Sequence, residues 1–379
     1  MDELGSLTSD LVSIASHEDE TAAGDFIEAW LRDETDADVT RDDVGNVIAR
    51  VNPGVGESLA LVGHHDVVPP APRQLTDDGE YIVETRDGRI YGRGAADMKG
   101  ADVAAMLAFR DAVEQRSTGN QTVSGDAAAS ATNEVVFASF VGEELGGNGV
   151  RAALDEGLSL DYAVVAEGST NYSGPNRTDL VVAHRGRRAS VLEVSGTACH
   201  ASEPEKGENA IYRACDAVDI VRELDVPDSE VLGNAVSGSI AVTEIDGGSA
   251  WNVIPDECSV IIDERTVPGG YADLAQTESI EGVEWVVEQD LPPMACDDAD
   301  FADRVFETAR RVHDARGDDA PEQVTKPHAT DAGWLAQEGT TCVVYGPSEP
   351  GEAHTKNESV SLDVLERCYE TYRDLLKEW

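Results

Sequence analysis

Positive charge is scarce in this chain. Its 379 residues contain 28 Lys and Arg against 75 Asp and Glu, a formal net charge of -47, and only five of the cations are lysines, at positions 99, 206, 326, 356 and 377. A nucleic-acid partner needs a surface of the opposite sign, so we expect none. Acids spread along the whole chain predict a halophilic protein, kept soluble in a salty cytoplasm where ions screen the self-repulsion.

Long apolar runs and paired cysteines are also missing. No uninterrupted apolar stretch reaches the ~18 residues that a membrane span requires, and the opening MDELGSLTSD lacks the basic and apolar regions of a secretory signal. We therefore expect a cytoplasmic protein with no membrane partner. The six cysteines are scattered without a Cys-x-x-Cys spacing, which argues against a zinc ribbon and favours reduced, buried side chains.

Short apolar segments alternate with amphipathic ones. The segments NVIARV, SLALVG, EVVFASFV and DYAVVAE are typical of strands, and KGADVAAMLAFRDAVEQ is typical of a helix. Because the last two strands lack polar alternation, we expect an α/β domain whose mixed sheet is covered by helices on both faces. The small polar residues of 117–133 predict a surface loop.

The rhythm changes near residue 178. Segments such as RASVLEVSG, GSIAVTEIDGG and CSVIIDERTV alternate more cleanly and predict an α+β unit with an antiparallel sheet. The α/β pattern resumes near residue 290 and continues to the end of the chain. We therefore expect one domain formed by residues 1–176 and 289–379, with residues 177–288 inserted as a second domain.

Acidic and histidine side chains follow the predicted strands or lie in glycine-rich turns. These residues are His64, Asp66, Asp97, Glu143, Glu144, Glu167 and His354. In open α/β sheets, ligands bind beyond the carboxyl ends of the strands, so these positions can converge. A single histidine at the end of a strand means little, and an acidic pair in so acidic a chain is usually surface. Five segments at one sheet edge are harder to explain as surface charge.

Imidazole nitrogens and carboxylate oxygens without thiolates favour zinc, with cobalt or manganese as competitors. The set is too large for one tetrahedral site that leaves a position open. It suits two divalent metal ions about 3.5 to 4 Å apart that share a carboxylate. Asp97, short and held in a turn, is the natural bridge.

The ordered motifs carry a resemblance over nearly the whole chain. They are His-x-Asp-x-Val-Pro, Gly-Arg-Gly-x-x-Asp-Met-Lys-Gly, Glu-Glu, a lone glutamate at a strand end, and His-Thr-x-Asn-Glu. This set resembles the di-zinc amidohydrolases that include acetylornithine deacetylase, succinyl-diaminopimelate desuccinylase and carboxypeptidase G. The resemblance implies that His64 and Glu167 hold one metal, that Glu144 and His354 hold the other, and that Asp97 bridges. It also implies that Glu143 is the general base.

Asp66 lies two residues after His64 and therefore on the same face of the strand. It can accept the second imidazole N–H and fix the tautomer of His64, a catalytic supporting role. The alternative is that Asp66 only caps the following turn. His65 should point away from the metals.

The inserted domain resembles the family's lid and dimerisation domain. In GTACHASEPEKGENAI, His200 is the candidate donor to the oxyanion, and in relatives it reaches the partner's site, which implies a homodimer. The alternative is an exposed loop histidine. Arg265 and Asn252 are the candidates for binding a substrate carboxylate. For Arg265, the alternative is an ion pair with Asp263 or Glu264.

These residues predict a metal-dependent amide hydrolase that removes the acyl group of an N-acyl amino acid. Its partners are then small molecules, N-acyl amino acids or short peptides. A dipeptidase or carboxypeptidase of the same family would use the same metals, so it stays open as an alternative. A non-catalytic metal-binding or peptide-binding protein is the alternative from a different class. A non-catalytic metal-binding protein has no need of a general base, so the presence of Glu143 beside Glu144 favours the enzyme.

Overall fold

The structure, a computed structural model, describes residues 3–119 and 133–379. The chain forms two compact units, the first from Met1–Val182, Ala295–Lys326 and Thr330–Trp379, and the second from Ala183–Met294 and Pro327–Ala329. The second unit thus begins and ends six residues later than the 177–288 expected from the sequence. The reason at its start is β8 (Leu180–His184), which pairs with a strand of the first unit's sheet. Residues 120–132, most of the predicted surface loop, lie outside the described part, and 117–119 end a helix.

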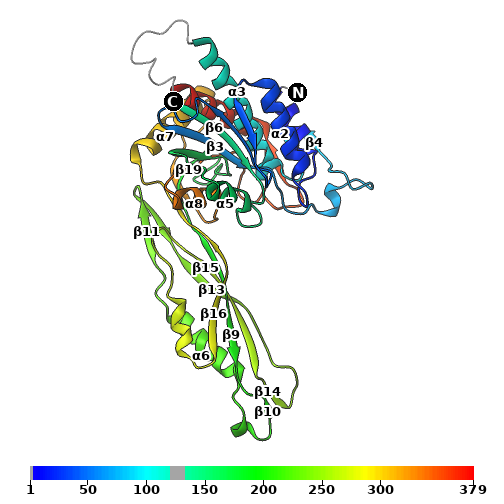
Figure 1. Ribbon diagram of the computed structural model, residues 1–379, viewed down its shortest axis with the longest axis vertical. Coiled ribbons are helices and arrows are strands. Elements are labelled where there is room, and N and C mark those ends of the chain that lie inside the picture. Colours follow the sequence, from blue (N-terminus) through cyan, green and yellow to red (C-terminus); the bar gives the residue numbers. More distant parts are fainter. Residues whose placement is uncertain (1–2, 120–132) are drawn as a thin grey trace. The chain divides into compact units, whose positions relative to one another are not determined.

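The first unit contains the main sheet, and its described residues form seven α-helices (Figure 1). Its helices are α1 (Glu3–Val12), α2 (Thr21–Glu34), α3 (Gly100–Gly119), α5 (Asn148–Asp155), α7 (Ala299–Arg316), α8 (Asp331–Gln337) and α9 (Leu362–Glu378). Besides β8, its strands are β1 (Asp38–Arg41), β2 (Val47–Val51), β3 (Ser58–His64), β4 (Glu84–Arg86), β5 (Arg89–Tyr91), β6 (Glu134–Phe140), β7 (Tyr162–Val165), β18 (Gln323–Lys326), β19 (Thr341–Val344) and β20 (Ser359–Ser361). β17 (Met294–Ala295) lies at the unit boundary.

The main sheet is mixed. Its strand order is β1-β2-β6-β3-β7-β19-β8-β17, with β18 paired to β8. The central strands β6, β3, β7 and β19 run parallel, while β1, β2 and β8 pair antiparallel with their neighbours. Every residue of β3 and β6 is buried, as expected for strands covered on both faces. The parallel centre brings the carboxyl ends of these strands to one edge.

Helices cover both faces of this sheet. α2 contacts β1 and β2, and α3 contacts β3 and β6 and packs against α9. α8 contacts β7 and β19, and α5 contacts α8. In Figure 1, α2 and α3 lie on the opposite side of the strands from α5 and α8. The predicted α/β class with a helix-covered mixed sheet is confirmed.

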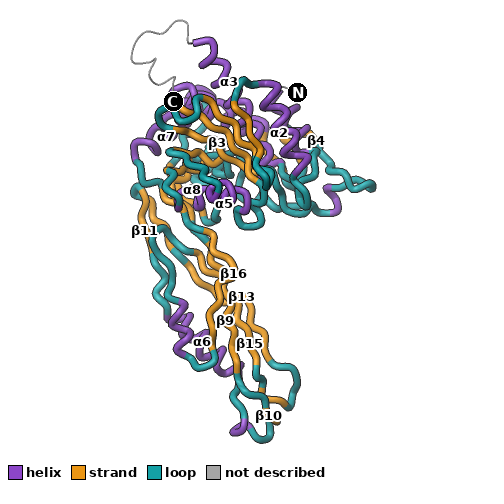
Figure 2. The backbone as a smooth tube through the Cα atoms, in the orientation of Figure 1, coloured by secondary structure: helices purple, strands orange, loops and turns teal. Residues whose placement is uncertain are grey.

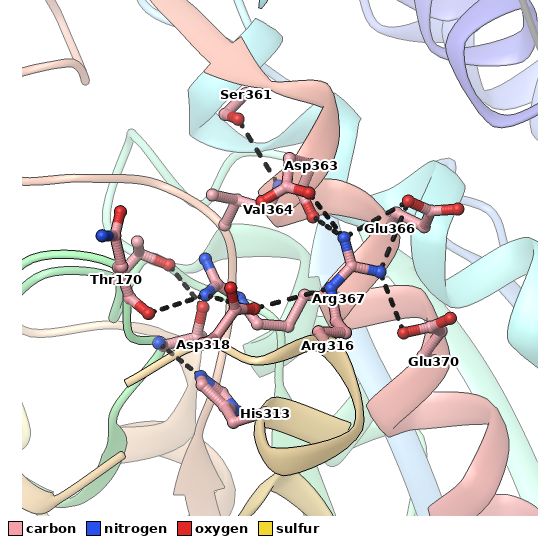
Figure 3. Close-up of polar contacts among 12 residues, drawn as sticks. Thr170, His313, Arg316, Asp318, Ser361, Asp363, Val364, Glu366, Arg367 and Glu370 are labelled. Carbon is pink, nitrogen blue, oxygen red and sulfur yellow. Dashed lines mark hydrogen bonds and ion pairs between the residues drawn. The ribbon is translucent and has the colours of Figure 1, made fainter. Parts of the chain in front are cut away.

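Ion pairs fasten α7 to α9 (Figure 3). Arg316 of α7 contacts three carboxylates of α9, those of Asp363, Glu366 and Glu370, at 2.6 to 3.3 Å. The buried Arg367 of α9 contacts Asp318 at 3.0 Å, just beyond the end of α7. In a chain so short of cations, one arginine thus neutralises several acids that would otherwise repel one another.

The second unit consists mainly of a four-stranded antiparallel sheet and one α-helix. The strands of this sheet are drawn in orange in Figure 2. The strand order is β13-β15-β9-β16, formed by Ser239–Gly247, Glu257–Arg265, Arg187–Ser195 and Val283–Leu291. The helix α6 (Ala210–Glu223) packs on the sheet through alanines, and Asn209 caps its first turn. The shorter strands are β10 (Cys199–His200), β11 (Asp228–Val231), β12 (Asn234–Ser237) and β14 (Val253–Ile254). No helix among the described residues is long and apolar enough to cross a membrane.

Candidate metal centre

Three neighbouring parallel strands bring potential ligands to one edge of the sheet. His64 is the last residue of β3, Glu143 and Glu144 follow β6, and Glu167 follows β7. Since β3 lies between β6 and β7 in the sheet, these side chains start from adjacent strand ends. The carboxyl ends of the strands are the usual ligand position in open α/β sheets.

The ligand atoms form two groups, and the atoms of each group lie within 4.8 Å of one another, in the sets His64, Glu143, Glu167 and Asp97, Glu144, His354. Asp97 belongs to the second group and also reaches His64 of the first. Its Oδ1 is 3.3 Å from His64 Nε2, and its Oδ2 is 3.1 Å from His354 Nε2. One oxygen therefore faces each group, which is the arrangement that a bridging carboxylate needs.

The donor atoms fit divalent cations. His64 Nε2 is buried and has no hydrogen-bond partner among the described residues, yet carboxylate oxygens of Asp97 and Glu167 lie 3.3 and 3.4 Å away. Ligands bonded at ~2.0–2.1 Å to a tetrahedral ion lie roughly 3.3 Å apart. In the second group, His354 Nε2 is 2.9 Å from Glu144 Oε1. Nitrogen and oxygen donors without sulfur suit zinc, cobalt or manganese.

Asp66 holds both the imidazole and the acidic pair in place. His64 Nδ1 lies 3.1 Å from the backbone oxygen of Asp66 and 3.2 Å from its Oδ1, so Nδ1 carries the proton and donates it. In the neutral form of His64, Nε2 is then left with a free lone pair for a metal. The backbone N–H groups of Glu143 and Glu144 donate to the two carboxylate oxygens of Asp66, at 3.1 and 3.0 Å. The sequence predicted the first contact but not the second.

The two adjacent glutamates face different groups. Glu144 Oε1 contacts His354, whereas Glu143 Oε2 lies 3.9 Å from His64 Nε2. Burial raises the pKa of Glu143 well above its ordinary value; the charge of His64 opposes this rise, and the carboxylates of Glu167 and Asp331 add to it. A carboxyl group with a raised pKa is suited to proton transfer near neutral pH.

The turn that carries Asp97 is fixed by a residue that sequence reasoning missed. Glu358, fully buried, accepts hydrogen bonds through Oε1 from the backbone N–H groups of Ala96 and Asp97, at 3.0 and 3.1 Å. Its Oε2 accepts from the buried Arg93 at 2.5 Å. The peptide bond between Asp97 and Met98 is cis. The signal was present, because Glu358 closes the same motif that contains His354.

Two further buried polar residues flank the centre. His65 is buried and its Nδ1 contacts Ser139 of β6 at 2.9 Å, so it belongs to neither ligand group. Asp331, at the start of α8, has no hydrogen-bond partner among the described residues for either carboxylate oxygen. Burial raises the pKa of Asp331 to about 8.

The remaining candidates belong to the second unit. His200 ends β10, is exposed, and its Nδ1 contacts Ser202 Oγ at 2.6 Å. The backbone oxygen of Asn252 accepts from Ala201 N–H at 2.9 Å. Arg265 forms the ion pair that the sequence left open, with Asp263 at 2.7 Å. Their roles toward a substrate stay predictions.

The sheet edge thus gathers two histidines and four carboxylates into two groups whose ligand atoms lie close enough together to hold metal ions. The chain belongs to peptidase family M20/M25/M40, whose profile matches residues 60–378. The family recognised from the motifs is thereby confirmed.

Three known proteins show what the chain is similar to. It is 29% identical over 332 residues to a succinyl-diaminopimelate desuccinylase of Xanthomonas oryzae, covering 84% of this chain and 83% of the relative. It is 29% identical over 323 residues to an acetylornithine deacetylase of Myxococcus xanthus, covering 82% and 77%. The fold resembles that of the aminopeptidase PepT of Bacillus cereus, with a TM-score of 0.72, 20% identity, and coverage of 99% and 97%.

Proposed function

We propose that the chain hydrolyses the amide bond of an N-acyl amino acid at a centre of two divalent metal ions. The observation that carries the proposal is the division of labour within the acidic pair. Glu144 contacts His354, while Glu143 lies in the first group with a raised pKa and makes no side-chain hydrogen bond in the described part of the chain. A carboxylate beside the ligands, with room to exchange a proton, is what amide hydrolysis requires.

We assign the ligands by these contacts. His64 and Glu167 would hold one ion and Glu144 and His354 the other, and Asp97, which presents one oxygen to each group, would serve both. When bound, such ions polarise the carbonyl and acidify water. Glu143 takes a proton from the attacking water and delivers it to the leaving nitrogen as the C–N bond breaks. Asp66 keeps His64 in the tautomer that frees Nε2.

The second unit supplies the substrate contacts in this proposal. His200, with its exposed imidazole, donates to the oxyanion, and Arg265 and Asn252 bind the carboxylate of the amino acid. Asp263 already orients the guanidinium of Arg265, because it accepts from Nε at 2.7 Å and from Nη2 at 3.4 Å. We also propose the homodimer that the family resemblance implies.

The names of the relatives support an acyl amino acid over a peptide. Both curated relatives remove an acyl group, while the likeness to the aminopeptidase, at 20% identity, is one of fold. The test is a panel of N-acetyl, N-succinyl and dipeptide substrates, assayed with zinc, cobalt and manganese. We expect kcat/KM to be highest for one of the acyl amino acids. A preference for dipeptides with every metal would refute the deacylase and favour the peptidase alternative.

The charge of the chain suggests where this chemistry takes place. The chain has a formal charge of -47, and we propose that it works in a cytoplasm of high salt, because salt ions screen much of the repulsion between its acids. Unfolding followed at low and molar potassium chloride tests this, since a stability that is indifferent to salt would refute it.

A further inference from the structure

Lys326 is a buried cation in a chain that has few. It ends β18, its side chain is 7% exposed, and it is one of only five lysines. Its Nζ lies 3.1 Å from Glu167 Oε2 and 3.0 Å from the backbone oxygen of Gly168. Burying an ammonium group is costly unless its protons are used, so this position calls for a reason.

The two oxygens of Glu167 have different surroundings. Oε2 accepts from Lys326, whereas Oε1 lies 3.4 Å from His64 Nε2 in the first ligand group. A carboxylate can bind a cation through one oxygen or both. With Oε2 held by the ammonium group and Gly168 anchoring the same group, only Oε1 is directed toward His64.

We propose that Lys326 is a positioning residue that makes Glu167 a one-oxygen ligand and fixes where that oxygen lies. This inference rests on the proposed metal centre and deepens it. Partners that orient a ligand typically change metal affinity 10- to 100-fold when they are removed. Lys326 would therefore set the affinity of the first site and leave the second site, formed around Glu144 and His354, unchanged.

A simpler explanation is that the pair only stabilises the fold. The chain offers a matched control in Arg367, labelled in Figure 3, which is also buried and also contacts one carboxylate and one backbone oxygen. Arg367 Nη1 lies 3.0 Å from Asp318 Oδ2 and 2.9 Å from the backbone oxygen of Asn176. None of these residues belongs to either ligand group.

The experiment is a metal titration of the metal-free full-length chain in competition with a chromophoric chelator at fixed salt. We expect wild type to bind two ions, and Lys326→Met to weaken one Kd about 10- to 100-fold with the other changed less than about threefold. Arg367→Met should lower Tm and leave both Kd values unchanged. Should Lys326→Met fail to fold, Lys326→Gln takes its place with the same expectation.

Two unchanged Kd values in the Lys326 variant would overturn the positioning role, and so would an equal weakening in the Arg367 control. A wild-type chain that binds no ions would instead refute the metal centre itself. Because affinity is measured on the resting protein, the answer does not depend on which substrate is hydrolysed.

Discussion

The contact between Glu358 and the turn that carries Asp97 should contribute strongly to the free energy of unfolding. Glu358→Ala removes the acceptor of three donors: the N–H groups of Ala96 and Asp97 and the guanidinium of the buried Arg93. Removing one partner of a buried ion pair costs about 3–5 kcal/mol, because the other charge stays buried and unpaired. The two backbone N–H groups that lose their acceptor lower the stability further. We therefore expect the free energy of unfolding to fall by at least ~3 kcal/mol, a large part of a typical 5–15 kcal/mol.

The assay is urea unfolding in the presence of a chelator and at constant salt, so that loss of metal does not contribute. Asp219→Ala is the control, because Asp219 pairs with Arg222 at side-chain exposures of 69% and 70%, and exposed pairs contribute only about 0–1 kcal/mol. The double variant Arg93→Met with Glu358→Leu should recover part of the loss, since no buried charge is then unpaired. If the free energy of unfolding of Glu358→Ala lies within about 1 kcal/mol of that of the control, the reasoning is refuted.

Three further predictions concern the site and the fold. Glu143→Gln should lower kcat by roughly 10²- to 10⁴-fold while both metals stay bound, and a variant that keeps its turnover would exclude Glu143 as the base. His354→Ala should remove or weaken one of two metals in elemental analysis; unchanged stoichiometry would count against that ligand. His313 Nε2 accepts from Thr178 N–H at 3.0 Å, and burial lowers the pKa of His313. Its contribution to the free energy of unfolding is therefore complete above pH ~6.5 and is lost as the pH falls below that value. The free energy of unfolding should therefore differ less between pH 7.5 and pH 5.5 in His313→Gln than in wild type. An equal difference in both proteins would refute this.

That the candidate side chains converge could be predicted from the sequence because they share a local signal. His64, Glu144 and Glu167 each lie at or just after the end of an apolar strand, and parallel strands end at one sheet edge. Which of them are ligands and which is the base came from the resemblance alone. The α/β class followed from the same alternation of segments. Motifs with close spacing supplied the rest, including Asp97 and His354.

The supporting residues could not be found in this way. Lys326 meets Glu167 across 159 positions, and Glu358 meets the backbone of Asp97 across 261, so neither contact leaves a periodic pattern. Glu358 is also one of 75 acids, most of them surface charge. The expected boundary at residue 177 placed β8 in the inserted unit, yet β8 pairs with β19 of the main sheet, a long-range contact that the local sequence does not reveal.

The central claim is that five side chains hold two ions while Glu143 stays free. Anomalous diffraction from crystals grown with zinc or cobalt tests it most directly. We predict two peaks, one within about 2.0–2.2 Å of His64 and Glu167, the other equally close to Glu144 and His354, with Asp97 touching both and Glu143 touching neither. A single peak, or Glu143 bonded to the first ion in place of Glu167, would contradict the account.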